Sequence, residues 1–295
     1  MALNLKTLVT RSISAAVFVV LLIGCVYWTY ISFSVFFFAV SMIGLNEFYK
    51  IAEKMGARPF KTIGFIFGIL TYVSFMSINN FLQVQSSSNS LSENEFMILN
   101  GIQKCSVAGI FLGPFIMLAF ALFSKNENSI KNAMFTIGGI FYAVLPFSLL
   151  NQTVYFDNGG DIATLSPKLI LGIIFLIWSN DTFAYLGGSL FGKNKMIEHV
   201  SPGKTWEGTI IGVLITFAVS FTFNSLIFKL DDYCWPILGI LIPVLATIGD
   251  LVESKLKREA GIKDSGSIMP GHGGVLDRFD SLIFVSPFVY VFFKL

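Results

Sequence analysis

Charged residues are scarce in this chain. Only 13% of its 295 residues are charged, 54% are hydrophobic, and the formal net charge is +2. A chain this apolar cannot bury its hydrophobic surface in a water-soluble globule, so we expect it to reside in a lipid bilayer. The small net charge gives no electrostatic basis for binding nucleic acid, and no such partner is expected.

Cysteine and histidine are rarer still. The three cysteines, Cys25, Cys105 and Cys234, lack metal-type spacing and lie in or beside apolar runs, which excludes a disulfide framework and a zinc site. The two histidines are His199 and His272. A loop histidine beside charged neighbours is more often solvated or hydrogen-bonded than catalytic, so a role for His199 as general base is only an alternative.

An uncharged run covers residues 12–46, after Lys6 and Arg11. As one helix it would rise roughly 52 Å, whereas the hydrocarbon core is about 30 Å thick. We therefore expect two spans with a turn at residues 30–34. Residues 22–25 are similar to a lipoprotein cleavage box, but apolar sequence continues beyond Cys25, so we expect a retained first span.

Apolar segments long enough to cross the bilayer recur along the rest of the chain. With the first pair they predict an all-α, polytopic integral membrane protein of about nine transmembrane helices. We expect N-terminal spans 1–5 in residues 1–165, and a catalytic region with two cytoplasmic loops in residues 166–295. The further spans are 62–81, 105–123, 132–155, 169–191, 208–228, 233–254 and 279–293.

Lysine and arginine gather on one side of this topology. The N-terminus and alternate loops carry all of them except Lys104, Lys168, Lys229 and Lys294. The positive-inside rule then places the N-terminus in the cytoplasm of a multi-pass protein of the cell membrane. It also places two polar loops, around residues 193–204 and 255–278, together on the cytoplasmic face, where a cytosolic substrate can meet a lipid.

The second of these loops adjoins the densest charge. Of 38 charged residues, 11 lie between Asp250 and Asp280. Asp250 lies inside an apolar span, where a lone carboxylate is costly and should face the protein interior. Helical spacing aligns Ser254, Lys257 and Arg258 with it on one face.

Asp277 and Asp280 share a face at the start of the last span. A hairpin of the last two spans could bring Asp250, Asp277 and Asp280 within reach of one cation. Three carboxylates are hard oxygen ligands that suit Mg²⁺ carrying phosphate. The alternative is a structural cluster of buried salt bridges with lysine and arginine.

A glycine-rich segment, Pro-Gly-His-Gly-Gly, covers residues 270–274 between these carboxylates. Glycines permit backbone N–H groups to approach an anion, and the segment opens onto a helix N-terminus that favours phosphate. Basic residues flank it, although anchoring to anionic lipid headgroups is an equal explanation for two of them, Lys255 and Lys263. The others are Lys257, Arg258 and Arg278.

The first loop carries a second polar motif. Gly188 and Gly192 follow Asp181 at helical spacing, which predicts close helix packing and an inward-facing carboxylate. Gly203-Lys204-Thr205 resembles the end of a Walker A loop, but Glu198 stands where that motif requires glycine, so a P-loop is rejected. Ser201, Lys204 and Thr205 remain candidate phosphate contacts.

Together these residues resemble the signature of the phosphatidate cytidylyltransferase family. The match runs Ser254-x-x-Lys257-Arg258-x4-Lys263-Asp264, then Pro270-Gly-His272-Gly273-Gly274-x-x-Asp277-Arg278-x-Asp280. Residues 180–181 and 201–208 also resemble this family. Met269 departs from its usual Leu, Ile or Phe, and a thioether is apolar enough to replace them.

The resemblance implies a reaction and a set of roles. CTP and phosphatidic acid would give CDP-diacylglycerol and pyrophosphate, with Mg²⁺ as cofactor and room for a second cation. A homodimer embedded in membrane lipid is also implied. The implied metal ligands are Asp250, Asp277 and Asp280; the implied phosphate ligands are Lys257, Arg258, His272 and Arg278, with Asp264 orienting one of these bases.

Two other functions fit part of the pattern. A secondary transporter also uses intramembrane carboxylates and glycine-broken helices, but its charges should follow a path near the midplane. Another CTP-dependent lipid kinase or transferase would share the chemistry and differ in the phosphorus attacked or the lipid used.

Overall fold

The computed structural model describes residues 5–76, 93–126, 128–153, 155–156, 164–165, 167–226, 234–268 and 273–294. The chain divides into two compact units, one formed by Met1–Leu165 with Asp264–Leu276 and the other by Ser166–Lys263 with Asp277–Leu295. The division of residues 1–165 and 166–295 into functional regions stays a prediction.

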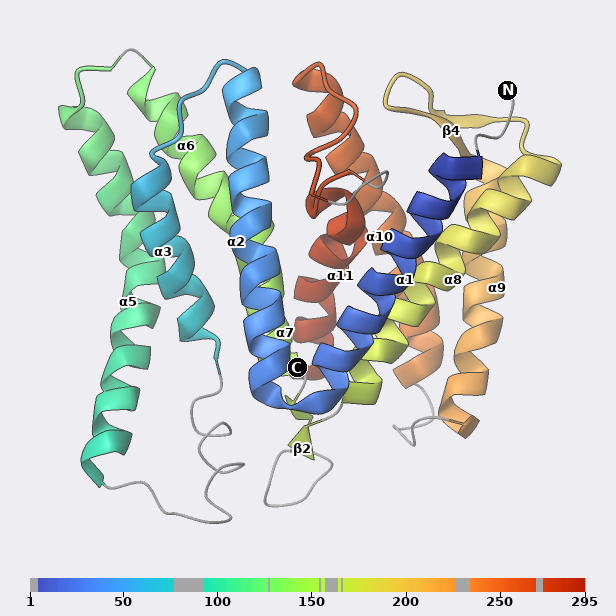
Figure 1. Cartoon of the computed structure of the whole chain (residues 1–295), viewed down its shortest axis with the longest axis horizontal. Helices are drawn as coiled ribbons and strands as arrows, with labels where there is room; N and C mark the ends of the chain where they lie inside the picture. Colours follow the sequence, from blue (N-terminus) through green and yellow to red (C-terminus); the bar gives the residue numbers. More distant parts are fainter. Residues whose placement is uncertain are drawn as a thin grey trace. The chain divides into compact units, whose positions relative to one another are not determined.

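Long helices dominate both units, with two short antiparallel sheets (Figure 1). The all-α prediction is therefore confirmed for the body of the fold. In chain order the elements are α1 Leu5–Trp28, α2 Tyr30–Lys54, α3 Lys61–Ser74, α5 Glu93–Phe123, α6 Ser129–Gly139, the π-helix η1 Ile140–Val144, α7 Leu145–Thr153, β1 Tyr155–Phe156, β2 Thr164–Leu165, α8 Pro167–Phe191, β3 Lys195–Ile197, β4 Ser201–Thr205, α9 Trp206–Leu226, α10 Cys234–Glu259 and α11 Leu276–Lys294.

Five of the described helical segments are long and apolar enough to cross a membrane: Tyr30–Lys54, Lys104–Phe123, Ser129–Thr153, Pro167–Phe191 and Cys234–Glu259. On α5, large apolar side chains such as Phe111, Phe115 and Phe123 are more than two-thirds exposed, at 71%, 71% and 84%. An apolar face of this kind is stable against lipid and costly in water. The fold is therefore that of a membrane protein.

Thr29 separates α1 from α2. Its hydroxyl accepts a hydrogen bond from the backbone N–H of Ser32, and the Ser32 hydroxyl accepts one from the backbone N–H of Thr29. This capping box satisfies donors that a helix start leaves unpaired. The uncharged run turns at Thr29, one residue before the range predicted for it, and residues 30–34 form the first turn of α2.

In the first unit, buried polar contacts hold α2 against its neighbours. The Tyr49 hydroxyl donates to the Thr136 carbonyl at 3.1 Å, and the Ser34 hydroxyl donates to Asn151 Oδ1 at 2.6 Å. The Tyr72 hydroxyl donates to the Ser34 carbonyl at 2.8 Å. Since unpaired polar groups are expensive in an apolar interior, these bonds specify how the helices pack.

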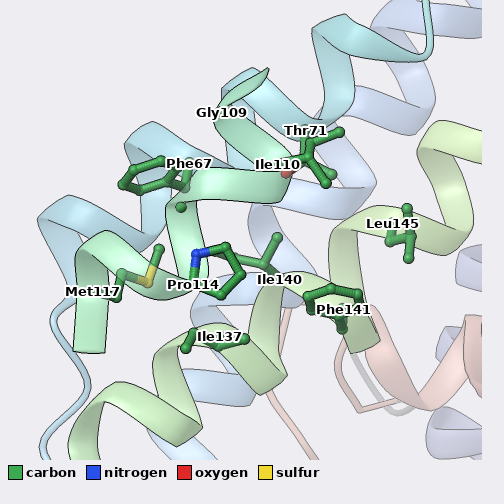
Figure 2. Close-up of a pocket in the computed structure, with 11 residues that line it drawn as sticks. Phe67, Thr71, Gly109, Ile110, Pro114, Met117, Ile137, Ile140, Phe141 and Leu145 are labelled. Carbon is green, nitrogen blue, oxygen red and sulfur yellow. The ribbon is translucent and has the colours of Figure 1, made fainter. Parts of the chain in front are cut away.

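The first unit also contains an apolar pocket between α3, α5, α6 and η1 (Figure 2). Phe67, Pro114, Met117 and Phe141 line it, and Thr71 supplies a hydroxyl. Among the described residues, those that line this pocket carry no charge, so they do not supply the groups that bind a triphosphate.

In the second unit, α8 and α9 run side by side (Figure 1) because glycines allow close approach. A Cβ atom at Gly208 would lie 2.8 Å from Gly188 Cα and 2.6 Å from the Ala184 carbonyl oxygen. The close packing predicted for Gly188 is confirmed. At Gly249 of α10, a Cβ would lie 2.8 Å from the Asp280 carbonyl oxygen, so α10 and α11 are similarly close.

Candidate active site

Lys257 joins α10 to α11. Its Nζ lies 2.6 Å from Asp277 Oδ1 and 3.0 Å from Glu253 Oε2. All three side chains are largely buried, with exposed fractions of 12%, 5% and 0% for Lys257, Asp277 and Glu253. The predicted helical hairpin therefore brings the start of α11 against the charged end of α10, with a lysine between the carboxylates.

Lys204 joins the β3–β4 hairpin to α10. Its Nζ lies 2.6 Å from Asp250 Oδ2, and Asp250 Oδ1 accepts a hydrogen bond from the Ser254 hydroxyl at 3.2 Å. Lys204 of the first polar loop thus contacts Asp250, the first charged residue of the stretch 250–280. A residue expected to bind phosphate contacts a residue expected to bind metal.

Asp181 and Asp280 complete a cluster of acidic side chains. Asp280 interacts electrostatically with Asp250, Asp181 and Lys257, and Asp181 interacts with Lys204. Carboxyl groups outnumber ammonium groups at this position. The cluster comprises Asp181, Asp250, Glu253, Asp277 and Asp280, with Lys204 and Lys257 as its cations.

The carboxylates do not converge as a simple metal cage. Among the residues that the structure describes, no three acidic, histidine or cysteine side chains come close enough to ligate one ion. Lys204 pairs with Asp250, whereas Lys257 pairs with both Asp277 and Glu253, so Asp250 and Asp277 face different ammonium groups. Four of these acidic residues, Asp181, Asp250, Asp277 and Asp280, were predicted from the sequence, but the way in which lysines separate them was not.

The remaining predicted residues have varied settings. Arg258 Nε donates to the Val200 carbonyl and Nη1 to the Ile262 carbonyl, both at 3.3 Å, so this side chain ties two loop segments together. Thr205 is buried, and its hydroxyl accepts from the Gly208 N–H at 3.2 Å in the first turn of α9. Ser201 begins β4 and is half-buried.

The glycine-rich segment is described in part. Lys263, Asp264 and Arg278 are exposed, whereas Gly274 is buried. Gly273 has a φ of 82°, a left-handed conformation that favours glycine. His272 lies outside the described residues, and so does Met269.

Comparison with known proteins identifies the family of the chain. Residues 9–295 match the profile of the Cytidylyltransferase family. The chain belongs to the cytidylyltransferase family. Three relatives are named phosphatidate cytidylyltransferase. The Staphylococcus epidermidis protein is 35% identical over 192 residues, or 64% of this chain and 70% of the relative. The Staphylococcus haemolyticus protein is 38% identical over 180 residues (60% and 65%), and the Staphylococcus aureus protein is 34% identical over 192 residues (64% and 70%). The predicted family membership is confirmed.

Sequence reasoning missed one member of this cytidylyltransferase's acidic cluster. Glu253 is fully buried, and none of the described residues donates a hydrogen bond to its Oε1. A buried carboxylate oxygen without a donor is costly and marks a position where a cation would be stabilised. Its position three residues after Asp250 in the same apolar pattern was the available signal.

A second buried carboxylate, Glu47 of α2, was also missed. Its side chain is 3% exposed and accepts three hydrogen bonds from residues around the glycine-rich segment. Its only signal in the sequence is an acidic residue at the end of an uncharged run.

Proposed function

We propose that this cytidylyltransferase transfers CMP from CTP to phosphatidic acid. A phosphate oxygen of the lipid attacks the α-phosphorus of CTP, and the bond from that phosphorus to the bridging oxygen breaks. The products are CDP-diacylglycerol and pyrophosphate. The observation that carries the proposal is the family match over residues 9–295, and the relatives' names support the substrate pair.

The chain's own residues are suited to positioning and charge neutralisation, which phosphoryl transfer chiefly requires. Lys204 and Lys257 present ammonium groups inside the acidic cluster, held by Asp250 and Asp277. Their proposed role is to bind the phosphates of CTP. Lys263, Arg278, Ser201, Thr205, Gly273, Gly274 and His272 are proposed as further substrate contacts, with Ser254 and Asp264 orienting charged neighbours.

The cluster fits a divalent cation in two respects. Its donors are carboxylate oxygens, the ligands that Mg²⁺ prefers. Its five carboxyl groups face two lysines, and Glu253 Oε1 accepts no hydrogen bond from any described residue. Among the described residues no three of these carboxylates come close enough to ligate one ion. We therefore propose that Asp250, Asp277 and Asp280 would each supply a ligand to Mg²⁺ that binds together with CTP, and that a second cation could bind with it. When bound, Mg²⁺ neutralises charge on the transferring phosphoryl group.

The proposal extends to the membrane arrangement. The predicted nine spans correspond in order to α1, α2, α3, α5, the α6–η1–α7 segment, α8, α9, α10 and α11. The lysine and arginine distribution supports a cytoplasmic N-terminus and an active site facing the cytoplasm. We also propose a homodimer, and a catalytic function for residues 166–295.

Family membership removes the basis for a transporter. A distinct CTP-dependent lipid transferase would produce a different product from the same nucleotide. Purified protein given phosphatidic acid, CTP and Mg²⁺ should release pyrophosphate and form CDP-diacylglycerol, with neither product when ATP replaces CTP. Transfer of the γ-phosphate to a lipid would contradict the proposal.

A further inference from the structure

Glu47 of α2 binds residues on both sides of the stretch 266–274, which includes the glycine-rich segment. The Glu47 carboxylate accepts from the Ser265 hydroxyl at 3.0 Å, from the Val275 N–H at 3.0 Å and from the Leu276 N–H at 2.9 Å. Ser265 precedes residues 266–274, and Val275 and Leu276 follow them. One carboxylate therefore binds the chain on both sides of residues 266–274.

The bonds to Val275 and Leu276 also cap α11. Leu276 is the first residue of this helix, so its N–H and that of Val275 belong to the group of donors that a helix start leaves unpaired. The positive end of the helix dipole stabilises the negative charge of Glu47. Asp277, the proposed metal ligand, is the next residue along the chain.

Glycines in the segment accommodate the carboxylate. A Cβ atom at Gly274 would lie 2.6 Å from Glu47 Oε1, and a Cβ at Gly266 would overlap the same oxygen. Two glycines thus leave the space that Glu47 occupies. This explains Gly266 and Gly274 by packing against the carboxylate, a reason different from phosphate approach.

A buried carboxylate is an expensive way to fill space. The described contacts of Glu47 are hydroxyl and amide donors, so its charge is balanced by hydrogen bonds and a helix end. An apolar side chain of similar size would fill the volume without that desolvation cost. What the carboxylate adds is a defined backbone position at residues 265 and 275–276.

We propose that Glu47 is a positioning residue of the transferase. It holds the chain at Ser265 and at residues 275–276, and thereby the start of the helix that carries Asp277. The role in turnover depends on the proposed function; the role in holding the backbone does not. Glu47 acts through residues 265–276, so it influences nucleotide binding without touching the nucleotide.

The test compares Glu47→Gln, Glu47→Asp and Glu53→Gln in the full-length protein in detergent. Glutamine keeps the volume but presents one acceptor oxygen to three donors; aspartate keeps the charge on a shorter side chain. Glu53 is the matched control, since it lies on α2, is 43% exposed and pairs with Lys61 at 2.9 Å. Three quantities are measured on folded, monodisperse protein: amide hydrogen exchange in residues 273–276, equilibrium binding of CTP, and kcat and KM for each substrate.

Glu47→Gln should accelerate exchange at Val275 and Leu276 at least tenfold and weaken CTP binding about tenfold, with KM for CTP raised more than KM for phosphatidic acid. Glu47→Asp should recover part of each loss, and Glu53→Gln should match the wild type. A variant that unfolds more readily but keeps wild-type CTP binding and kinetics per folded molecule would overturn the proposal. Unchanged hydrogen exchange would overturn it as well.

If Glu47→Gln does not fold, Gly266→Ala reaches the same contact from the other side, with Gly24→Ala as control because a Cβ at Gly24 meets nothing within 4 Å. Gly266→Ala should give the same exchange and CTP-binding changes, and wild-type values would overturn the proposal. If the wild type forms no CDP-lipid, the proposed function fails, while hydrogen exchange still decides whether Glu47 holds residues 275–276.

Discussion

The Lys257 ammonium lies 2.6 Å from an oxygen of Asp277 and 3.0 Å from an oxygen of Glu253, and the Glu253 side chain is fully buried. This lysine neutralises two carboxylates that come from different helices. A buried pair costs most when one partner is removed, because the other charge stays behind. Lys257 is therefore expected to matter for stability as well as for substrate binding.

Lys257→Met should lower the unfolding free energy by about 3–5 kcal/mol and reduce turnover at least a hundredfold, since Asp277 and Glu253 lose their shared cation. Adding Glu253→Gln should recover part of the stability, because one of the two stranded charges is removed. Thermal unfolding in detergent and a CDP-lipid assay measure the two effects. Lys255→Met is the control, as Lys255 is half exposed and pairs with Glu259 on the surface; equal losses in both variants would contradict the argument.

Asp277→Asn should abolish turnover while the protein still inserts and purifies normally. Asparagine retains an oxygen that can accept from Lys257, so the contact between α10 and α11 survives, but the negative charge that would hold Mg²⁺ is lost. We expect kcat to fall by roughly 10²–10³ or more. Activity within a few-fold of the wild type would remove Asp277 from the proposed metal site.

Lys204→Ala should raise KM for CTP about tenfold and leave KM for phosphatidic acid within two- to threefold, since one charge-assisted contact to phosphate is worth roughly 1.5–3 kcal/mol. Lys204 also pairs with Asp250, so Asp250→Asn and the double variant should show non-additive effects. Lys195→Ala serves as control, because Lys195 lies in the same hairpin and is exposed. An unchanged KM for CTP would exclude Lys204 from nucleotide binding.

Gly208→Ala should destabilise the second unit by about 1–3 kcal/mol, because its Cβ would meet backbone atoms of Ala184 and Gly188 that cannot rotate away. Gly24→Ala on α1 should be neutral or slightly stabilising, since open space surrounds that position and alanine is the better helix former. Thermal unfolding of both variants in the same detergent tests the contrast. Equal thermal unfolding midpoints for the two variants would show that α8 and α9 can move apart at little cost in stability.

Helix positions could be predicted from the sequence because length and apolarity are local properties. The uncharged run of residues 12–46 had to turn back, and the turn falls at Thr29, whose capping box with Ser32 supplies the physical reason. The predicted loop at 193–204 instead forms the β3–β4 hairpin, with Lys195 paired to Thr205 and Ile197 to Ser201. Short strands of this kind carry little periodic signal.

Most residues of the candidate site could be predicted from the sequence, but the contacts between its lysines and carboxylates could not. Asp250, Asp277 and Lys204 were found because charge is rare in an apolar chain, yet which lysine meets which carboxylate depends on tertiary packing. Glu253 was overlooked because it stands among other charges. Glu47 was overlooked because its partners, Ser265, Val275 and Leu276, lie more than 200 residues away.

The most direct test of the central claim is product formation by detergent-purified protein. The account predicts that CDP-diacylglycerol and pyrophosphate appear together, in equal amounts, only when phosphatidic acid, CTP and Mg²⁺ are all present, and that Asp277→Asn forms neither. Absence of both products from folded wild-type protein, or a phosphorylated lipid with CDP released, would contradict it.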